Sequence, residues 1–313
     1  MSFSANVKEE LSRQIPTARH CRIAELAAAI SLSGKVVETG GSKSIEIHTE
    51  NVAVAKKFFT LLKKTFNINT DISTRRTEYP RKSNIYMLSV EEEDKVDEVL
   101  QSLKVVDEEG RDILCGNMVD GLLIQKTCCK RAFIRGAFLA AGSISDPEKS
   151  YHFEIACDTS SQAETLRNLI NSFELDSKII MRKNNYVVYI KESAQIVEIL
   201  NVMEAHVALM ELENIRILKD MRNSVNRKVN CETANLNKVV NAAVKQVEDI
   251  RLIESKMGLD KLSDSLAEIA RLRLENPDVP LKELGAMLEP PVGKSGVNHR
   301  LRKIGEIADG LRG

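Results

Sequence analysis

An internal repeat constrains the fold of this chain more than any other feature of its sequence. Residues 49–100 and residues 159–200 share one pattern, which is an amphipathic helix, two strands joined by a turn, and a second amphipathic helix. Phe66 at the end of the first helix matches Phe173, and the alternating strand IYMLSV matches YVVYIK. The pattern predicts one structural unit that was duplicated, or two similar units that were fused.

A further helix that ends in glycine and enters a strand precedes each copy. The first, LAAAISLSG, covers residues 26–34, and the second, IRGAFLAAG, covers residues 134–142. Each repeat is therefore predicted to run helix, hairpin, helix, hairpin, helix. Small side chains allow two helices to approach closely, so we expect the repeats to pack through these two helices. The small residues are Ala27, Ala28, Ala29, Ser31 and Ser33 in the first helix and Gly136, Ala137, Ala140 and Ala141 in the second.

The composition is that of an ordinary globular protein, with 43% hydrophobic and 29% charged residues in 313. No run approaches the roughly 18 apolar residues of a membrane span, and the first residues are too acidic for a signal peptide. A soluble cytoplasmic protein with no membrane partner is predicted. Lys+Arg and Asp+Glu both number 45, so affinity for nucleic acid has to come from a local patch. Aromatic residues make up only 4%, which argues against base-stacking platforms.

The sequence lacks the common catalytic and metal-binding spacings. It contains no H-E-x-x-H, G-x-S-x-G or G-x-G-x-x-G motif, and Leu288 stands where a P-loop ending at Gly293-Lys294-Ser295 needs glycine. None of the six cysteines forms a C-x-x-C pair or a zinc spacing with histidine. We therefore expect no catalytic residue, no metal and no cofactor, with reduced cysteines filling apolar space.

The repeat helices resemble a known family. FIRGAFLAAGSIS, residues 133–145, resembles the LAGLIDADG helix of homing endonucleases, and the duplicated unit is similar to the single-chain form of that fold. Over its full length the chain resembles the WhiA family through three segments: CCKRAFIRGAFLAAGSISDP, NRKVNCETANLNKVVNAA and PPVGKSGVNHRLRKI. The resemblance implies an α+β fold, in which a two-repeat LAGLIDADG homing-endonuclease-like domain of helices on antiparallel sheets precedes an all-α helix-turn-helix domain.

The same resemblance implies a function. Members are bacterial transcription regulators linked to cell division and sporulation in Gram-positive bacteria. It implies binding to double-stranded promoter DNA in the cytoplasm, on the nucleoid, with help from a partner transcription factor or RNA polymerase.

The resemblance also locates the residues that would cut DNA in a nuclease. In homing endonucleases the carboxylate just before the last glycine of each helix holds divalent metals, whereas this chain has Ser33 and Ala141 there. The earlier acidic position is Ser31 in one helix and Leu139 in the other. We expect no cleavage, and a residual metal-dependent endonuclease is the alternative. Basic hairpin residues either contact phosphates or form a solvated face. These are Arg75, Arg76, Arg81, Lys82, Arg182 and Lys183.

The last third of the chain carries only helical patterns. We expect LAGLIDADG-like repeats over 1–105 and 106–221, a linker over 222–231, and a helical domain over 232–313 with a helix-turn-helix at 281–309. The preceding helix is predicted to end at about Met221. The linker is basic, so Arg222, Arg227 and Lys228 are candidate phosphate contacts, although a merely soluble charged linker fits equally well.

The sharpest functional signal lies in the last predicted helix. A helix that ends near Glu275 and a short helix from Leu281 precede it, which is the helix-turn-helix order. Val297, Leu301 and Ile304 are spaced to point inward, and Ser295 is placed to cap the helix. Its outer face is then a candidate major-groove reader, against the alternatives of a solvated helix that binds a protein or a scaffold whose DNA binding is incidental. The candidate DNA-binding residues are Lys294, Ser295, Gly296, Asn298, His299, Arg300, Arg302 and Lys303.

Overall fold

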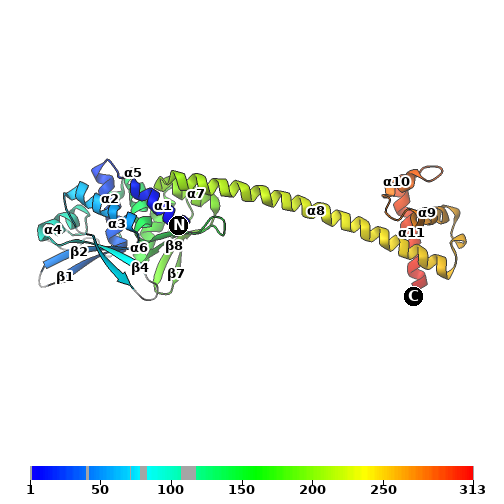
Figure 1. Cartoon of the computed structure of the whole chain (residues 1–313), viewed down its shortest axis with the longest axis horizontal. Coiled ribbons are helices and arrows are strands. Elements are labelled where there is room, and N and C mark those ends of the chain that lie inside the picture. Colours follow the sequence, from blue (N-terminus) through cyan, green and yellow to red (C-terminus); the bar gives the residue numbers. More distant parts are fainter. Residues whose placement is uncertain (1, 40–41, 71, 78–82, 107–117, 313) are drawn as a thin grey trace. The chain divides into compact units, whose positions relative to one another are not determined.

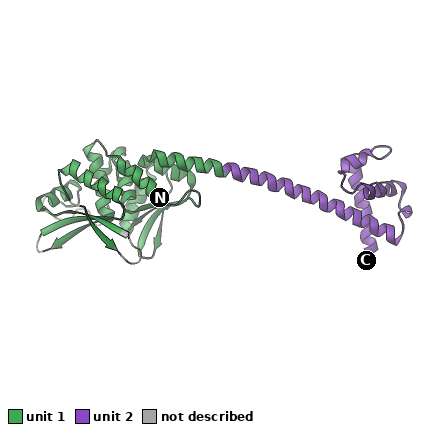
Figure 2. Cartoon of the chain, in the orientation of Figure 1, with its two compact units in different colours: residues 1–219 green, residues 220–313 purple. Residues whose placement is uncertain are grey.

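A computed structural model describes residues 2–39, 42–70, 72–77, 83–106 and 118–312. The chain divides into two compact units, residues 1–219 (unit 1) and 220–313 (unit 2) (Figure 2). None of the helices in the described ranges is long and apolar enough to cross a membrane.

Unit 1 contains two copies of one arrangement of helices and hairpins (Figure 1). The predicted order of helix, hairpin, helix, hairpin, helix is confirmed in both copies, and an additional helix, α1 (Phe3–Arg13), precedes the first. The first copy comprises α2 (Arg19–Ser33), β1 (Gly34–Thr39), β2 (Ser42–Thr49), α3 (Val52–Phe66), β3 (Ile72–Thr77), β4 (Ser83–Val90) and α4 (Glu93–Ser102). The second comprises α5 (Thr127–Ala141), β5 (Gly142–Ile144), β6 (Phe153–Cys157), α6 (Ser160–Asn171), β7 (Lys178–Arg182), β8 (Asn185–Ile190) and α7 (Ser193–Met203), and a short 3-10 helix, η1 (Gly121–Ile124), comes before it.

Each copy forms a four-stranded antiparallel sheet with the same topology. The strand orders are β1-β2-β4-β3 and β5-β6-β8-β7, so the second and fourth strands of each copy pair in the middle. Ile47 pairs with Leu88 in one sheet and Ile155 with Val188 in the other, and all four side chains are buried. In β6, Phe153, Ile155 and Cys157 are buried and alternate with more exposed residues, as expected for a sheet with one face against helices.

The two copies join through α2 and α5, as the small residues predict. Gly136 shows how close the helices are, because a Cβ atom built there would lie 2.3 Å from the Glu25 carbonyl oxygen and 3.1 Å from the Ala28 Cβ. Buried residues of both helices, such as Leu26 and Phe133, belong to one continuous core. A side chain larger than hydrogen at position 136 would therefore separate the two repeats.

A buried charge network lies across the same junction. Glu25 is fully buried on α2 and pairs with Lys57 of α3, and Arg135 Nε of α5 lies 3.3 Å from the same Glu25 oxygen, Oε1. Arg135 also donates to Glu204 Oε2 at 2.6 Å and to the Met203 carbonyl at 3.3 Å. Lys57 Nζ donates to the Leu11 carbonyl at 2.8 Å. One carboxylate therefore serves two buried cations that come from different repeats.

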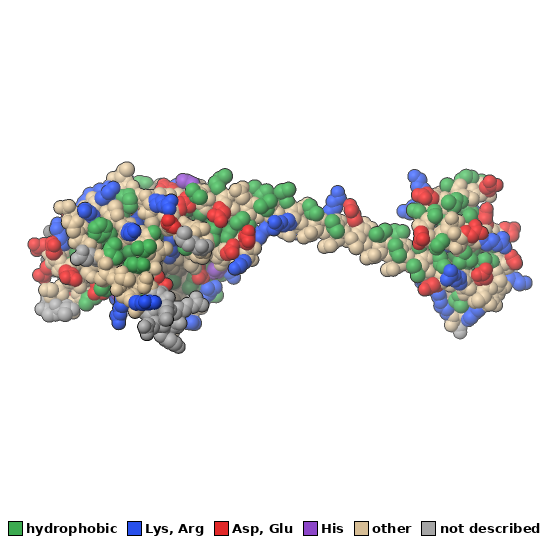
Figure 3. Space-filling view, viewed as in Figure 1, with side chains coloured by type: hydrophobic (Ala, Val, Ile, Leu, Met, Phe, Trp, Pro, Cys, Tyr) green, Lys and Arg blue, Asp and Glu red, His purple; other side chains and the backbone are tan. Residues whose placement is uncertain are grey.

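The predicted linker at 222–231 is helical in the structure. These residues lie inside α8 (His206–Lys256), a helix of 51 residues, so the prediction that a helix ends near Met221 is wrong. Polar residues suggested a break, but residues 206–256 contain neither Gly nor Pro, and exposed Asn, Ser, Arg and Lys are tolerated on a helix surface. Hydrophobic side chains are also exposed along α8 (Figure 3). They are Val207, Met210, Ile217, Leu218, Met221, Val225, Val229, Leu236, Val239, Val240 and Val244.

Unit 2 forms its own small helical core. After the end of α8, it contains the 3-10 helix η2 (Leu259–Lys261), α9 (Asp264–Glu275), α10 (Leu281–Ala286) and α11 (Lys294–Arg312). Ile250 and Ile253 from the end of α8 are buried against residues of these helices. The predicted end of a helix at Glu275 and the short helix from Leu281 are both confirmed.

Candidate nucleic-acid interface

Helices α10 and α11 form a closely packed pair in unit 2. The loop between them returns on itself, because the Val292 amide donates to the Gly285 carbonyl at 2.9 Å. A Cβ atom at Gly285 would lie 2.0 Å from the Val292 carbonyl oxygen and 2.9 Å from a methyl group of Val297. The absence of a side chain at position 285 therefore permits the close crossing of α10 and α11. The loop covers 287–293 and is longer than the turn of a minimal helix-turn-helix.

Arg273 organises the turn that leads into α10. Its side chain is buried and donates to Gln246 Oε1 at 3.1 Å and to the Val279 carbonyl at 2.7 Å, with longer bonds to the Asn276 and Pro277 carbonyls. Burial lowers the pKa of this guanidinium from its usual value. A lone arginine in an amphipathic helix gives no sequence signal for this role, because surface arginines have the same spacing.

The inner and outer faces of α11 are as predicted. Val297, Leu301 and Ile304 are buried in the core of unit 2. The opposite side chains are exposed, and the segment 294–303 contains basic residues but no acidic one. The exposed candidate residues are Lys294, Ser295, Asn298, His299, Arg302 and Lys303.

The start of α11 differs from the prediction in one detail. The helix begins at Lys294, so Ser295 lies inside the first turn and does not cap the helix. Gly293 precedes the helix, and its carbonyl accepts a hydrogen bond from the Val297 amide at 3.1 Å. Ser295 remains exposed beside the free amide groups of the first turn, which is the position at which a helix binds phosphate.

Two other candidate residues contact the protein itself. The Arg300 guanidinium donates to the Ser265 carbonyl at 3.4 Å and lies 4.0 Å from Glu268, so its side chain is directed toward α9. At Gly296 a Cβ atom would lie 2.5 Å from a methyl group of Val292, so this glycine is needed for packing against the loop. The sequence pattern places both residues on the helix but does not show which neighbour they face.

The remaining cations leave the outer face of α11 positive. Arg302 Nε lies 3.5 Å from Glu306 one turn later, and both side chains are about two-thirds exposed. Within the described residues no acidic group lies within ion-pair distance of Lys294 or Lys303. Exposed ion pairs such as Arg302–Glu306 are weak and exchange readily for a phosphate or a base edge.

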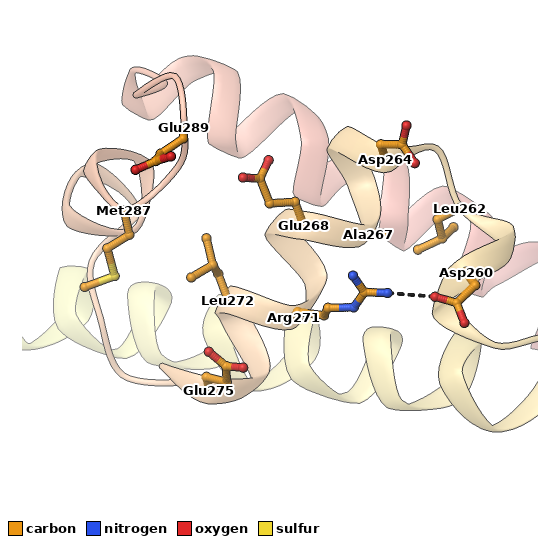
Figure 4. Close-up of a pocket in the computed structure, with 10 residues that line it drawn as sticks. All are labelled: Asp260, Leu262, Asp264, Ala267, Glu268, Arg271, Leu272, Glu275, Met287 and Glu289. Atoms are coloured by element: carbon orange, nitrogen blue, oxygen red, sulfur yellow. Dashed lines mark hydrogen bonds and ion pairs between the residues drawn. The ribbon is translucent and has the colours of Figure 1, made fainter.

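An acidic groove lies elsewhere on unit 2 (Figure 4). In it, Glu268 of α9 projects toward Met287 and Glu289 from the loop after α10, and Arg271 of α9 points the other way and is paired with Asp260 at 2.7 Å. Negative charge repels phosphate, so this groove is excluded as the DNA-binding surface. Its acidic residues are Asp260, Asp264, Glu268, Glu275 and Glu289.

The three candidate phosphate contacts in the segment that was predicted to be a linker, Arg222, Arg227 and Lys228, are exposed on α8 but do not share a face. A helix rotates by about 100° per residue, so Arg222 and Arg227 point roughly 140° apart and Lys228 a further 100° away. The helix brings no two of them to one side. In unit 1, Arg75 and Arg76 are exposed on β3, Arg182 is paired with Glu154 at 2.9 Å, and Arg81 and Lys82 lie outside the described residues.

The helix ends that would hold metal in a nuclease carry no carboxylate at the expected positions. Ser33 Oγ donates to the Ala29 carbonyl at 2.8 Å, and Ser31 Oγ donates to the Met118 carbonyl at 3.2 Å. Ala141 and Leu139 occupy the matching positions of α5. The two serine hydroxyls satisfy backbone groups, which is a structural role.

Three family models together match most of the chain. The model of the WhiA N-terminal LAGLIDADG-like domain matches residues 19–106, that of the WhiA LAGLIDADG-like domain matches residues 130–222, and that of the WhiA C-terminal HTH domain matches residues 225–308.

Relatives and solved structures agree with these models. A "Probable cell division protein WhiA" from Lachnoclostridium phytofermentans is 55% identical over 315 residues and covers 100% of both chains. A protein of the same name from Clostridium beijerinckii is 50% identical and covers 100% of this chain and 99% of its own. The crystal structure of full-length DUF199/WhiA from Thermatoga maritima has a TM-score of 0.60 at 24% identity, covering 99% of this chain and 98% of that one, and supports the same fold. The predicted α+β fold with LAGLIDADG-like repeats and a helix-turn-helix domain is thus confirmed, and the chain belongs to the WhiA family of bacterial cell division proteins.

Proposed function

We propose that this protein is a sequence-specific regulator of transcription that binds promoter DNA of cell-division or sporulation genes through α11. The observation that carries the proposal is the outer face of α11, which is exposed, basic and without an acidic residue from 294 to 303. The helix-turn-helix arrangement presents such a face to the major groove. The name shared by the relatives, cell division protein, supports the choice of target genes.

The positions of the candidate residues along α11 suggest which of them contact phosphate and which contact base edges. Lys294 and Ser295 lie in the first turn, where free amide groups and a lysine attract phosphate without reading sequence. Asn298, Arg302 and Lys303 lie farther along the exposed face, and such side chains pair with adenine or guanine edges. His299 lies beside them. Arg300 and Gly296 would then position α11 and not contact DNA, because Arg300 contacts α9 and Gly296 packs against the preceding loop.

Unit 1 would act as a scaffold that does not cut DNA. Ser33 and Ala141 replace the carboxylates that hold metal in homing endonucleases, so neither helix end offers a hard anionic ligand there. Arg222, Arg227 and Lys228 face different directions on α8, so they would form no single contact patch and would add only a diffuse, sequence-independent attraction for phosphate. A single reading helix gives modest affinity, so a partner transcription factor or RNA polymerase on the nucleoid would assist.

The test is capture of fragmented host genomic DNA by the purified full-length protein at physiological salt. Wild type is compared with Arg302→Ala/Lys303→Ala and with a matched control, Lys238→Ala/Lys245→Ala, which removes the same charge from exposed positions of α8. We expect wild type and control to recover the same promoter fragments and the α11 variant to lose them. Recovery of the same fragments by the α11 variant would transfer recognition to another surface and favour the scaffold alternative.

Two further measurements separate the proposed roles. Lys294→Ala should weaken binding to promoter and random DNA alike and reduce the salt dependence by about one phosphate contact. Incubation of the captured promoters with the protein and Mg²⁺ should leave the duplex intact. Specific nicks in those promoters would instead support the endonuclease alternative.

A further inference from the structure

Four side chains with metal-binding atoms converge where the two repeats meet in unit 1. His20 and Cys21 lie in the first turn of α2, and Cys128 and Cys129 lie in the first turn of α5. His20 Nδ1 is 3.2 Å from Cys129 Sγ and 3.3 Å from Cys21 Sγ. All four ligand atoms lie within 4.8 Å of one another. We refer to these four residues as the His-Cys cluster.

The repeat accounts for the cluster, and it also explains why the spacing of the cysteines concealed it. Aligning Gly34 with Gly142, the residues that follow α2 and α5, places His20 on Cys128 and Cys21 on Cys129. Each repeat contributes two adjacent ligands, so the sequence contains no C-x-x-C or cysteine-histidine spacing of the usual kind. The close packing of α2 against α5 brings the two pairs together. The expectation that cysteines only fill apolar space is incomplete for this group.

The separations of the ligand atoms are compatible with a tetrahedral ion. A zinc ion bound by three thiolates and one imidazole has Zn–S distances of about 2.3 Å and Zn–N of about 2.0 Å, which puts its ligand atoms roughly 3.5 to 3.8 Å apart. The observed separations of 3.2 Å, 3.3 Å and at most 4.8 Å bracket that range, so small side-chain shifts suffice.

The burial of the four residues supports the same interpretation. Cys21 and Cys129 are buried, whereas His20 and Cys128 are exposed, so an ion has both a protected site and a route from solvent. Cys157 provides the contrast, because it is buried in the core on β6 and belongs to no such group among the residues that the structure describes. Filling apolar space does not require a histidine and three thiols with their polar atoms together, two of them at the surface.

We propose that His20, Cys21, Cys128 and Cys129 bind one structural Zn²⁺ that joins the first turns of α2 and α5. Each thiol releases its proton to solvent as the Zn–S bond forms, and neutral His20 coordinates through Nδ1. No electron is transferred. The ion would link the two repeats at the ends of the helices opposite Ser33 and Ala141, where nuclease metals bind. This inference does not depend on DNA binding.

The first experiment measures zinc in the full-length protein. Wild type, Cys128→Ser and Cys231→Ser are purified under reducing conditions, supplied with equimolar zinc chloride, desalted and analysed by plasma mass spectrometry. Cys231 is the matched control because it is also an exposed cysteine but lies on α8. We expect about one zinc per chain in wild type and in Cys231→Ser, and less than about a tenth of that in Cys128→Ser. Substoichiometric zinc in wild type, or full zinc in Cys128→Ser, would overturn the proposal.

A second measurement covers the case in which Cys128→Ser fails to fold. Co²⁺ added to the metal-free wild type should give the intense visible bands of tetrahedral coordination with a sulfur charge-transfer band, and His20→Ala should weaken Co²⁺ binding by at least about tenfold. Chelation should lower the melting temperature of wild type and Cys231→Ser alike. Weak octahedral Co²⁺ spectra, or a disulfide within the cluster in protein purified with zinc and without reductant, would count against a resident ion.

Discussion

Two pairs of positive side chains, one pair in each unit, are used in opposite ways. In unit 1, Lys57 and Arg135 are buried and share the carboxylate of Glu25, whereas in unit 2 Lys294 and Lys303 are exposed on α11. A buried charge that loses its partner costs several kcal/mol, while an exposed one costs little until it meets an opposite charge. Lys57 and Arg135 therefore stabilise the junction between the repeats, whereas Lys294 and Lys303 have no acidic partner within ion-pair distance among the described residues.

The pKa shifts in unit 1 show how finely its charges are balanced. Burial lowers the pKa of Lys57 although Glu25 acts to raise it. Burial also opposes the charge of Arg135, but Glu25 and Glu204 outweigh it and raise the pKa of the guanidinium. Glu25 raises the pKa of both cations, so removing its charge is the most severe test of the network.

Glu25→Gln should produce the largest effect. It leaves Lys57 and Arg135 buried without their shared carboxylate, and we expect the free energy of unfolding of unit 1 to fall by about 3 to 5 kcal/mol. Urea unfolding followed by circular dichroism measures the change. Glu38→Gln, at a position with a side chain 69% exposed, is the control and should stay within about 0.5 kcal/mol of wild type. A similar small change in Glu25→Gln would show that the network contributes little.

Arg302→Ala should give the complementary result in unit 2. Because its side chain is 70% exposed, we expect unfolding to change by less than about 0.5 kcal/mol. Specific binding to a captured promoter should weaken by about 1 to 3 kcal/mol, and binding to a scrambled duplex much less. Fluorescence anisotropy with both duplexes measures the difference. Equal losses of affinity for the two duplexes would show that Arg302 contacts phosphate and does not read a base.

The sequence predicted the elements of both units better than the contacts between them. Hydrophobic periodicity identified the repeats, and the small residues around Gly136 predicted the packing of α2 on α5. Local signals failed where a tertiary contact decides the outcome. The direction of Arg300 depends on α9, and the His-Cys cluster depends on two repeats meeting. The continuity of α8 has another explanation, because its polar segment resembles a linker in composition but contains no Gly or Pro that would end a helix.

Lys8→Met tests whether unit 1 tolerates a desolvated cation without a buried partner. Burial lowers the pKa of Lys8 to about 8, and its ammonium lies 5.8 Å from the centre of the Phe138 ring. Because the unfolded state binds the proton more tightly, the charge destabilises unit 1 fully below pH 8, and this cost disappears as the pH rises toward 10.5. Lys8→Met should then raise stability at pH 7 by about 1 kcal/mol, less than the whole shift represents because the side chain keeps part of its hydration.

Thermal unfolding of both proteins at pH 7 and at pH 10 measures this effect of Lys8. The advantage of Lys8→Met should shrink at the higher pH, where the wild-type lysine is mostly neutral in the folded state. An advantage that does not change with pH would come from packing against Phe138 and not from charge.

Arg300→Ala should have the smallest effect on promoter affinity, and it tests whether a cation with an internal partner also contacts DNA. Its guanidinium bonds to the Ser265 carbonyl at 3.4 Å and approaches Glu268 at 4.0 Å, with a side chain 26% exposed. Long contacts of this kind stabilise weakly, so unfolding should change by less than about 1 kcal/mol. Promoter affinity should fall less than in Arg302→Ala, because Arg300 already faces α9. The same anisotropy titration compares the two variants. A larger loss of promoter affinity in Arg300→Ala than in Arg302→Ala would mean that the Arg300 side chain leaves α9 to contact DNA. Arg300 would then exchange its internal partners for the DNA.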